Sequence, residues 1–241
     1  MIPGFSGPDA ARAAARRVDR PRSLWYVRAV SVRGTSFASF SSVAAELIEL
    51  SRFCHERGWT PATSGNFSAR LGDGSLAITA SGRPKGALGV SDIVVVNADG
   101  RLTGPSPARP SAETALHCQL YRHSSEIGAV AHTHSRAATV LSRRCAQEGY
   151  VTLSGYEVAK ALSGMTTHTA TVLLPVFVNT QDIRRLAEDV DAFMSAHPPV
   201  YGYLIAGHGL YTWGSDIAST IRHIEAIEFM LDCALLEGGL S

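Results

Sequence analysis

The sequence of 241 residues has few cysteines, little net charge and no long apolar run, and each shortage excludes a class of protein. Its four cysteines lie far apart and form no CxxC pair, which favours reduced thiols in the cytoplasm over a disulfide framework. No run of about 18 apolar residues exists, so we expect no membrane-spanning helix. The net charge of +1 does not favour general nucleic-acid binding. We therefore expect neither a membrane nor a nucleic acid as a partner.

Positive charge is concentrated in the first forty residues. They hold seven arginines and two aspartates, a net charge of +5, so residues 41–241 carry a net charge of −4. The segment shows no sustained helical or strand periodicity and lacks the apolar stretch of a secretory signal. We expect residues 1–40 to be a disordered extension or not part of the mature fold, with an organelle transit peptide as the alternative.

Residues 41–241 contain no repeat and no linker, so we expect one catalytic domain. Hydrophobic residues make up 45% of the chain, which is enough for a substantial core. Apolar periodicity and turn residues predict helices at 41–57, 112–123, 135–147, 181–196 and after 215, and strands at 67–71, 76–80, 93–97, 129–131, 173–178, 203–205 and 210–213. Because helices and strands intermix, the expected class is α/β or α+β, with one sheet covered by helices.

The sharpest feature is the tripeptide His132-Thr133-His134, which follows an apolar run. Side chains at i and i+2 of an extended segment point to one side, so both imidazoles can bind one ion. His208 lies between two glycines, which would allow a tight turn near a ligand. Three histidines match a catalytic zinc site, although polar strand ends are the simpler alternative. The other six are interpreted as packing, surface or loop residues: His55, His117, His123, His168, His197 and His223.

Two loops carry groups that suit a phosphate. Residues 63–66, Thr-Ser-Gly-Asn, offer hydroxyls, an amide and a flexible backbone. Residues 81–86, Ser-Gly-Arg-Pro-Lys-Gly, add the cations Arg83 and Lys85. Such loops can form backbone anion cups, and their charged tips attract phosphate. Neither loop matches a Walker A or a dinucleotide motif, so two ordinary turns are the alternative.

Two glutamates are candidates for moving protons. Glu113 opens a predicted helix after a proline corner, where its charge also suits the helix dipole. Glu157 lies three residues before Lys160, and an ordinary helical ion pair would explain it equally well. Beside a bound metal ion, a carboxylate can instead carry protons to and from a substrate carbon. The spacing in sequence does not decide which glutamate lies near the histidines.

Five short motifs follow one another in a fixed order: Thr63-Ser64-Gly65-Asn66, Thr79-Ala80-Ser81-Gly82, Pro110-Ser111-Ala112-Glu113, His132-Thr133-His134 and Gly207-His208-Gly209. Together they resemble the class II aldolase/adducin family, over about residues 43–237. Longer strings such as GWTPATSGNFSARL and HTHSRAATVLSR look like its bacterial branch of methylthioribulose-1-phosphate dehydratases, which belong to methionine salvage.

This resemblance implies a three-layer α/β/α fold with a central, mostly antiparallel sheet, and a homotetramer. It implies one Zn²⁺ per subunit, held by His132, His134 and His208. The substrate is expected to be a small ketose phosphate. Its phosphate is expected near loop residues of the motifs and near the loop cation: Gly65, Asn66, Ser81, Gly82, Lys85 and Ser111.

The implied activity is that of a hydro-lyase, which converts 5-methylthioribulose 1-phosphate to 5-methylthio-2,3-dioxopentyl phosphate. In aldolase members the residue at the Glu113 position is the base, whereas in eukaryotic dehydratases a glutamate at the Glu157 position is the acid/base. We favour Glu157 for removing the C3 proton and expect Glu113 to support it or to protonate the leaving group.

Two other functions are open at this point. A zinc-dependent sugar-phosphate aldolase or epimerase is the alternative within the family. Aldolases have Ser-Ser before the glutamate, whereas this chain has Ser111-Ala112, which argues against aldol chemistry. An adducin-like binding module without chemistry is the alternative outside the enzymes, and the retained histidines argue against it.

Overall fold

A computed structural model describes residues 39–238 of the chain. The arginine-rich extension predicted over residues 1–40 therefore lies, except for its last two residues, outside the described residues. The helices are α1 (Phe40–Glu56), α2 (Thr114–His123), α3 (Arg136–Arg144), α4 (Ile183–Ala196) and α5 (Ile217–Glu237), and the short 3₁₀ turns are η1 (Lys85–Ala87), η2 (Val90–Asp92) and η3 (Glu157–Ala161).

Eight strands form one sheet in the order β3-β2-β1-β4-β8-β7-β6-β5. Every neighbouring pair is antiparallel except β6 and β7, which run parallel, so the predicted mostly antiparallel sheet is confirmed. The strands are β1 (Asn66–Arg70), β2 (Leu76–Thr79), β3 (Ile93–Val96), β4 (Ala129–Thr133), β5 (Tyr150–Ser154), β6 (Thr171–Phe177), β7 (Gly202–Ile205) and β8 (Gly209–Gly214).

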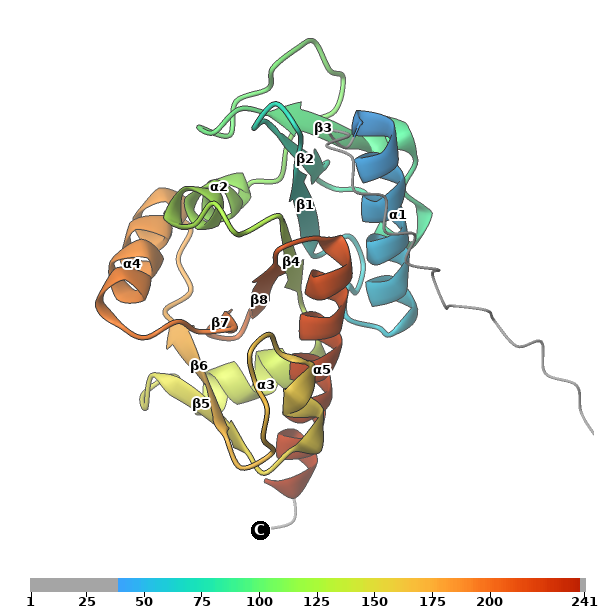
Figure 1. The fold of residues 1–241 in the computed structure, drawn as a ribbon. Helices are drawn as coiled ribbons and strands as arrows, with labels where there is room; N and C mark the ends of the chain where they lie inside the picture. Colours follow the sequence, from blue (N-terminus) through green and yellow to red (C-terminus); the bar gives the residue numbers. More distant parts are fainter. Residues whose placement is uncertain (1–38, 239–241) are drawn as a thin grey trace, which may run out of the picture. The chain divides into compact units, whose positions relative to one another are not determined.

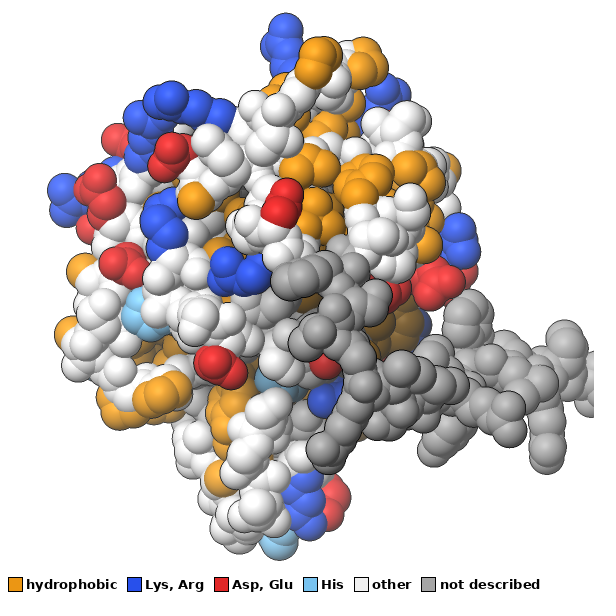
Figure 2. Space-filling model, turned by 45° about the horizontal axis from the view of Figure 1, so that its top comes forward, with side chains coloured by type: hydrophobic (Ala, Val, Ile, Leu, Met, Phe, Trp, Pro, Cys, Tyr) orange, Lys and Arg blue, Asp and Glu red, His pale blue; other side chains and the backbone are white. Residues whose placement is uncertain are grey.

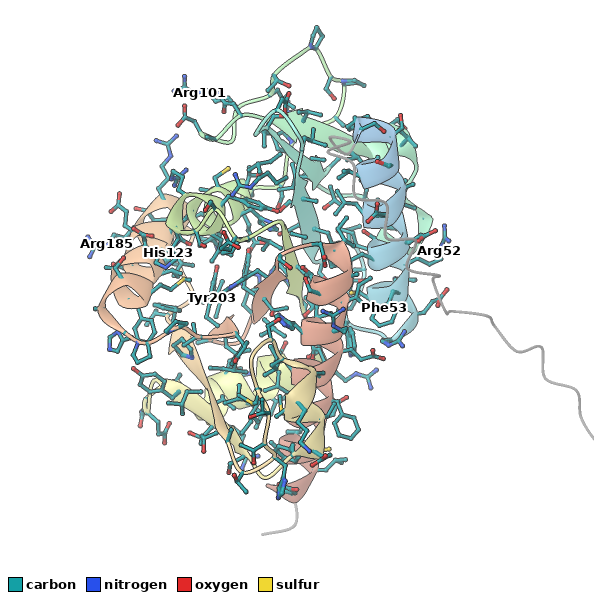
Figure 3. All side chains as sticks on the ribbon, in the orientation of Figure 1. Arg52, Phe53, Arg101, His123, Arg185 and Tyr203 are labelled. Carbon is teal, nitrogen blue, oxygen red and sulfur yellow. The ribbon has the colours of Figure 1, made fainter. Side chains whose placement is uncertain are left out.

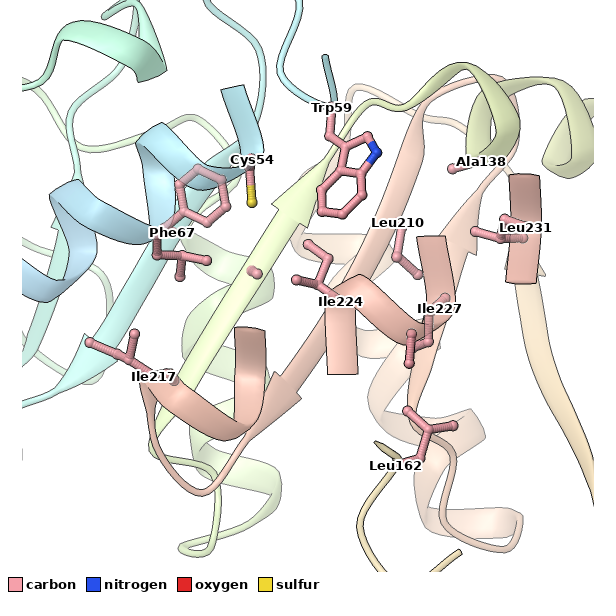
Figure 4. Close-up of a cluster of buried hydrophobic side chains, with 14 of the residues drawn as sticks. Cys54, Trp59, Phe67, Ala138, Leu162, Leu210, Ile217, Ile224, Ile227 and Leu231 are labelled. Carbon is pink, nitrogen blue, oxygen red and sulfur yellow. The ribbon is translucent and has the colours of Figure 1, made fainter. Parts of the chain in front are cut away.

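Helices cover both faces of this sheet, as the three-layer prediction required. Figure 1 shows α1 and α5 on one side and α2 and α4 on the other. The core under α1, α3 and α5 includes Phe67, Leu210 and Ile227 (Figure 4). The core under α2 and α4 includes Leu120 and Tyr203, whose ring lies inside the molecule (Figure 3). Two separate cores follow because successive strand side chains point to opposite faces.

Helix α1 begins earlier than the sequence predicted. Its N-cap is Ser39, whose hydroxyl accepts a hydrogen bond from the Ser42 backbone N–H at 3.3 Å, and not Ser41 or Ser42. The helix ends before Gly58, which adopts a φ of +74°. The expected position of the helix is therefore right within two residues at its start.

Strands β4 and β5 depart from the prediction, and β6 begins two residues before its predicted start. Strand β4 continues two residues beyond the apolar run, because His132 and Thr133 pair with Tyr211 and Leu210 of β8. Strand β5 was not predicted, although its burial alternates residue by residue. Strand β5 forms through antiparallel pairing with β6, and its weakly apolar sequence does not predict this pairing. The extension of β4 matters most, because it mounts the histidine pair on a rigid strand.

The surface carries charges of both signs. In the view of Figure 2, Lys and Arg side chains are interspersed with Asp and Glu side chains. None of the helices between residues 39 and 238 combines the length and the apolar character needed to cross a bilayer.

Candidate metal centre and active site

Three histidines converge at one end of β4 and β8. The Nε2 atoms of His132 and His134 lie 2.8 Å apart, those of His134 and His208 lie 3.1 Å apart, and those of His132 and His208 lie 3.3 Å apart. The structure therefore brings together the three predicted ligands, although 74 residues separate His134 from His208 in the chain.

Local backbone structure explains this convergence. His132 is the fourth residue of β4, and His134 follows directly after the strand with its backbone N–H bound to the Trp59 carbonyl at 2.7 Å. Gly209 must be glycine, because a Cβ atom there would lie 1.9 Å from the Thr133 carbonyl oxygen. The close approach of β8 to β4 is what carries His208 to the other two rings.

The neutral imidazole rings of the cluster can offer nitrogen lone pairs to a cation. His132 donates its Nδ1–H to the Leu210 carbonyl at 2.9 Å, so its Nε2 carries a lone pair. Burial and the neighbouring His208 hold the pKa of His132 well below its usual value. Burial and the two neighbouring imidazoles lower the pKa of His134 to about 3. All three Nε2 atoms thus face one another, an arrangement that a shared divalent cation stabilises.

The spacing fits zinc. Zn–N bonds of about 2.0–2.1 Å place tetrahedral ligand atoms roughly 3.3 Å apart. The observed separations are 2.8, 3.1 and 3.3 Å, so small movements of the rings would reach that geometry. Three imidazoles also leave a coordination position for another oxygen atom, as in catalytic zinc sites.

Glu113 completes the cluster. It is the N-cap residue of α2, and its side chain is only 13% exposed. Its Oε1 atom lies 3.1 Å from His208 Nε2, and its Oε2 atom lies 3.3 Å from His132 Nε2. Asn66 donates its Nδ2–H to Oε2 at 2.7 Å. Ligand atoms of these four titratable residues, three imidazoles and one carboxylate, all lie within 4.8 Å of one another.

The cluster opens into a cavity of about 780 Å³. All the residues predicted to surround the phosphate line this cavity: Gly65, Asn66, Ser81, Gly82, Lys85 and Ser111. Gly65 has a φ of +77°, and a Cβ atom there would lie 2.8 Å from the His132 carbonyl oxygen. The first phosphate loop therefore packs directly against the strand of the histidines.

Lys85 is a buried cation that has no ion-pair partner among the described residues. Its side chain is almost completely buried, and Nζ donates to the carbonyls of Thr63 and Arg83 at 2.9 and 2.8 Å. No carboxylate of residues 39–238 lies within ion-pair distance of it. Burial lowers the pKa of Lys85 to about 8, although the charge of Asp92 opposes this shift. An anion in the cavity would supply the missing counter-charge.

Two predicted residues have other surroundings than expected. The Asn66 side chain is bonded to Glu113 and to His117, so its amide is not free for a phosphate. Glu157 lies on η3 with a 71% exposed side chain, paired with Lys160 at 2.5 Å. That hydrogen bond lowers the pKa of Glu157. Glu157 does not line the cavity of its own chain and does not belong to the histidine cluster.

Sequence reasoning missed two neighbours of the cluster. Tyr211 of β8 stacks on the His132 ring, with centroids 4.0 Å apart and planes 15° apart. His117, interpreted as a packing or surface residue, is fully buried and hydrogen-bonded to Asn66. A signal for His117 was present, because it follows Glu113 by four residues and so shares one face of a helix with it.

Comparisons with known proteins agree with this geometry. The family model described as "Class II Aldolase and Adducin N-terminal domain" matches residues 45–235. A methylthioribulose-1-phosphate dehydratase of Methylococcus capsulatus is 53% identical over 194 residues, which cover 80% of this chain and 93% of that protein. One of Marinobacter nauticus is 50% identical, covering 81% and 94%. A solved L-fuculose 1-phosphate aldolase superposes with a TM-score of 0.69 at 25% identity, covering 86% and 91%.

Proposed function

Since this chain belongs to the class II aldolase and adducin family, we propose that it is a lyase that dehydrates 5-methylthioribulose 1-phosphate to 5-methylthio-2,3-dioxopentyl phosphate. The observation that carries this proposal is the cluster of three imidazoles and a carboxylate beside a cavity that Lys85 also lines, a buried cation without an ion-pair partner among residues 39–238. The close relatives, which are named as dehydratases, favour loss of water over aldol cleavage.

We propose that one zinc ion per subunit is held by His132, His134 and His208. When bound, such an ion supplies positive charge that stabilises negative charge developing on substrate oxygen atoms. The depressed pKa values of His132 and His134 support this proposal, because both rings are neutral ligands at physiological pH.

The phosphate end of the substrate is assigned to the loop side of the cavity. The ammonium group of Lys85 supplies the charge, and the backbone of Gly65 and Gly82 allows a close approach. The Ser111 hydroxyl accepts the Glu113 backbone N–H at 3.2 Å and keeps its own proton for donation. These contacts would orient the sugar chain so that its carbonyl end lies toward the histidines.

Glu113 is the group of this chain placed to move protons. Dehydration needs a base that takes the C3 proton and an acid that protonates the departing C4 hydroxyl, after which the enol becomes the diketone. Its carboxylate lies beside the histidines, whereas Glu157 does not line this cavity. We therefore propose that Glu113, and not Glu157 as favoured from the sequence, takes the C3 proton and that the C4 hydroxyl leaves as water.

The role expected for Glu157 then depends on assembly. Because Glu157 is exposed on η3, it can serve a cavity only when a neighbouring subunit presents it. We propose a cytoplasmic homotetramer in which Glu157 protonates the leaving group in the partner's cavity. The free cysteines of the described residues are compatible with a reducing compartment.

The decisive experiment is incubation of purified, metal-assayed protein with 5-methylthioribulose 1-phosphate. The proposal predicts that mass spectrometry will detect the diketone phosphate, which is lighter than the substrate by the mass of one water molecule. Aldol cleavage would instead release a three-carbon ketone phosphate and an aldehyde. The second product pattern would favour the aldolase alternative. The superposition with an L-fuculose 1-phosphate aldolase is the reason to test for it. Absence of both products with zinc-loaded protein would contradict enzyme function on this substrate class.

A further inference from the structure

Helix α2 and strand β1 interlock through a continuous row of polar side chains. Glu113, His117 and Tyr121 follow one another at intervals of four along α2, while Asn66 and Ser68 are alternate residues of β1. Four helical residues rise about 6 Å and two strand residues about 6.6 Å, so the two rows stay in register. We call these five residues the α2–β1 zipper.

Four hydrogen bonds link the five side chains of the zipper in one row. Tyr121 Oη lies 2.8 Å from Ser68 Oγ, and Ser68 Oγ lies 2.7 Å from His117 Nδ1. His117 Nε2 is hydrogen-bonded to Asn66 Oδ1. The row then ends where Asn66 Nδ2 meets Glu113 Oε2 at 2.7 Å. The three middle residues are buried, so water does not complete these bonds.

The chemistry of the groups fixes the direction of every proton. A carboxylate only accepts, so the Asn66 amide nitrogen donates to Glu113 and its carbonyl oxygen must face His117. His117 therefore carries its proton on Nε2. Burial lowers the pKa of His117 to about 4, so the ring is neutral and its Nδ1 is an acceptor. Ser68 donates to Nδ1, and Tyr121 donates to Ser68.

We infer that His117 is a positioning residue for the proposed dehydration, acting through the Asn66 amide to hold the Glu113 carboxylate in one orientation. A lone asparagine could turn its amide over, which would set its oxygen against the carboxylate. The Nε2–H of His117 donates to the amide oxygen of Asn66, so it is compatible with only one of these two orientations. In that orientation Oε2 of Glu113 accepts the Asn66 N–H, whereas Oε1 accepts no hydrogen bond from the zipper and lies 3.1 Å from His208 Nε2. Oε1 is thus the oxygen left for the substrate.

Histidine substitutions at two buried positions test this inference, which rests on the proposed function. In His117→Phe the donor is lost but a ring remains, so kcat should fall about 10–100-fold, the usual effect of losing a supporting hydrogen bond, with KM and zinc content nearly unchanged. His117→Gln restores a donor near the Nε2 position and should recover kcat to within about threefold of the unmodified protein.

His223→Phe is the matched control. His223 is also buried and bonded, to Ser163 and to the Trp213 carbonyl, but it does not line the cavity of the histidine cluster. It should lose thermal stability and keep its kcat. The inference is overturned if His117→Phe keeps its kcat, if His117→Gln is as slow as His117→Phe, or if His223→Phe loses as much turnover.

A measurement without turnover separates this inference from the proposed function. In ¹⁵N-histidine-labelled protein, long-range nitrogen–proton correlations should show His117 as the neutral tautomer with its proton on Nε2, from about pH 5 to pH 9. A proton on Nδ1, or a charged ring, contradicts the inference directly. Protein with the expected tautomer but no activity on the substrate would contradict only the proposed function.

Discussion

At the scale of single residues, the division of labour between two carboxylates is the main question. Glu113 touches the histidine cluster, whereas Glu157 is exposed on η3. We expect Glu113→Gln to lower kcat by about 10²–10⁴-fold, because a positioned general base contributes about that much. Steady-state kinetics with zinc analysis would check this. Turnover near that of the unmodified protein, with zinc bound, would remove Glu113 from the mechanism.

His134 tests the metal ligands themselves. His134→Ala removes one of three converging lone pairs, so the variant should lose both bound zinc and activity. Metal analysis of the purified variant checks the first loss and the diketone assay the second. A variant that is active and zinc-replete would contradict the ligand assignment. His197→Ala is a suitable control, since His197 is exposed at the end of α4 and lies outside both the cluster and its cavity.

Glu228 should make folding stability depend on pH. It is fully buried on α5, accepts the Thr133 hydroxyl at 2.6 Å, and burial raises its pKa from 4.5 to about 7. Because the native state holds this proton more tightly than the unfolded state, its contribution is complete below pH 4.5 and is lost as pH rises through 7. The full change is at most about 3 kcal/mol.

Glu228→Gln removes that titration. The variant should therefore gain stability relative to the unmodified protein between pH 4.5 and pH 8, whatever the difference is at acid pH. Urea unfolding of both proteins at pH 4.5, 6 and 8 measures it. A stability difference that does not change with pH would show that folding does not raise the pKa of Glu228.

At the scale of elements, the meeting of β4 and β8 determines the metal centre. Gly209→Ala would put a Cβ atom 1.9 Å from the Thr133 carbonyl oxygen and 3.2 Å from His132 Cε1. We expect a loss of about 1–3 kcal/mol in stability and weaker zinc binding, because the strands must separate. Thermal unfolding and zinc titration would check both. Gly104→Ala, where a Cβ atom meets nothing within 4 Å, is the control and should change neither.

Elements also show what the sequence could and could not predict. Periodicity located the five helices, and the spacing of His132 and His134 predicted a shared ion on an extended segment. It could not show that β4 continues through the histidines, because that extension depends on pairing with β8, about 80 residues later. Strand β5 was missed for the same reason. The zipper was missed because polar residues four apart on a helix, or two apart on a strand, are common on exposed faces. Only the contact between α2 and β1 shows that the two rows are bonded to each other.

At the scale of the whole molecule, a bound ion should stabilise the fold. The three ligands join β4 and β8, and without an ion their lone pairs face one another. Zinc at 100 times its Kd would add about 2.7 kcal/mol. For a chain of this size, this corresponds to a rise in Tm of roughly 5–10 °C. Calorimetry with chelator and then with added zinc checks this, and His134→Ala should show no response.

Assembly can be tested with two inactive variants. If the partner subunit's Glu157 serves each cavity, mixed assemblies of Glu113→Gln and Glu157→Gln contain some cavities with both intact carboxylates. We expect activity to return when the two variants are unfolded, mixed and refolded together, and not when either is refolded alone. Failure to regain activity, with assembly confirmed by native mass spectrometry, would place both functions within one chain.

The solitary ammonium group of Lys85 makes ligand capture a proton-coupled event. With a pKa of about 8 and no ion pair to a carboxylate of residues 39–238, it is partly discharged in mildly alkaline solution. Arrival of a dianion would draw a proton from the buffer onto the amine. Titration calorimetry near pH 8 should then give apparent binding enthalpies that scale with the ionisation enthalpy of the buffer. Raising the pH above 8 should also lower the affinity for the phosphorylated compound more than the affinity for its uncharged analogue.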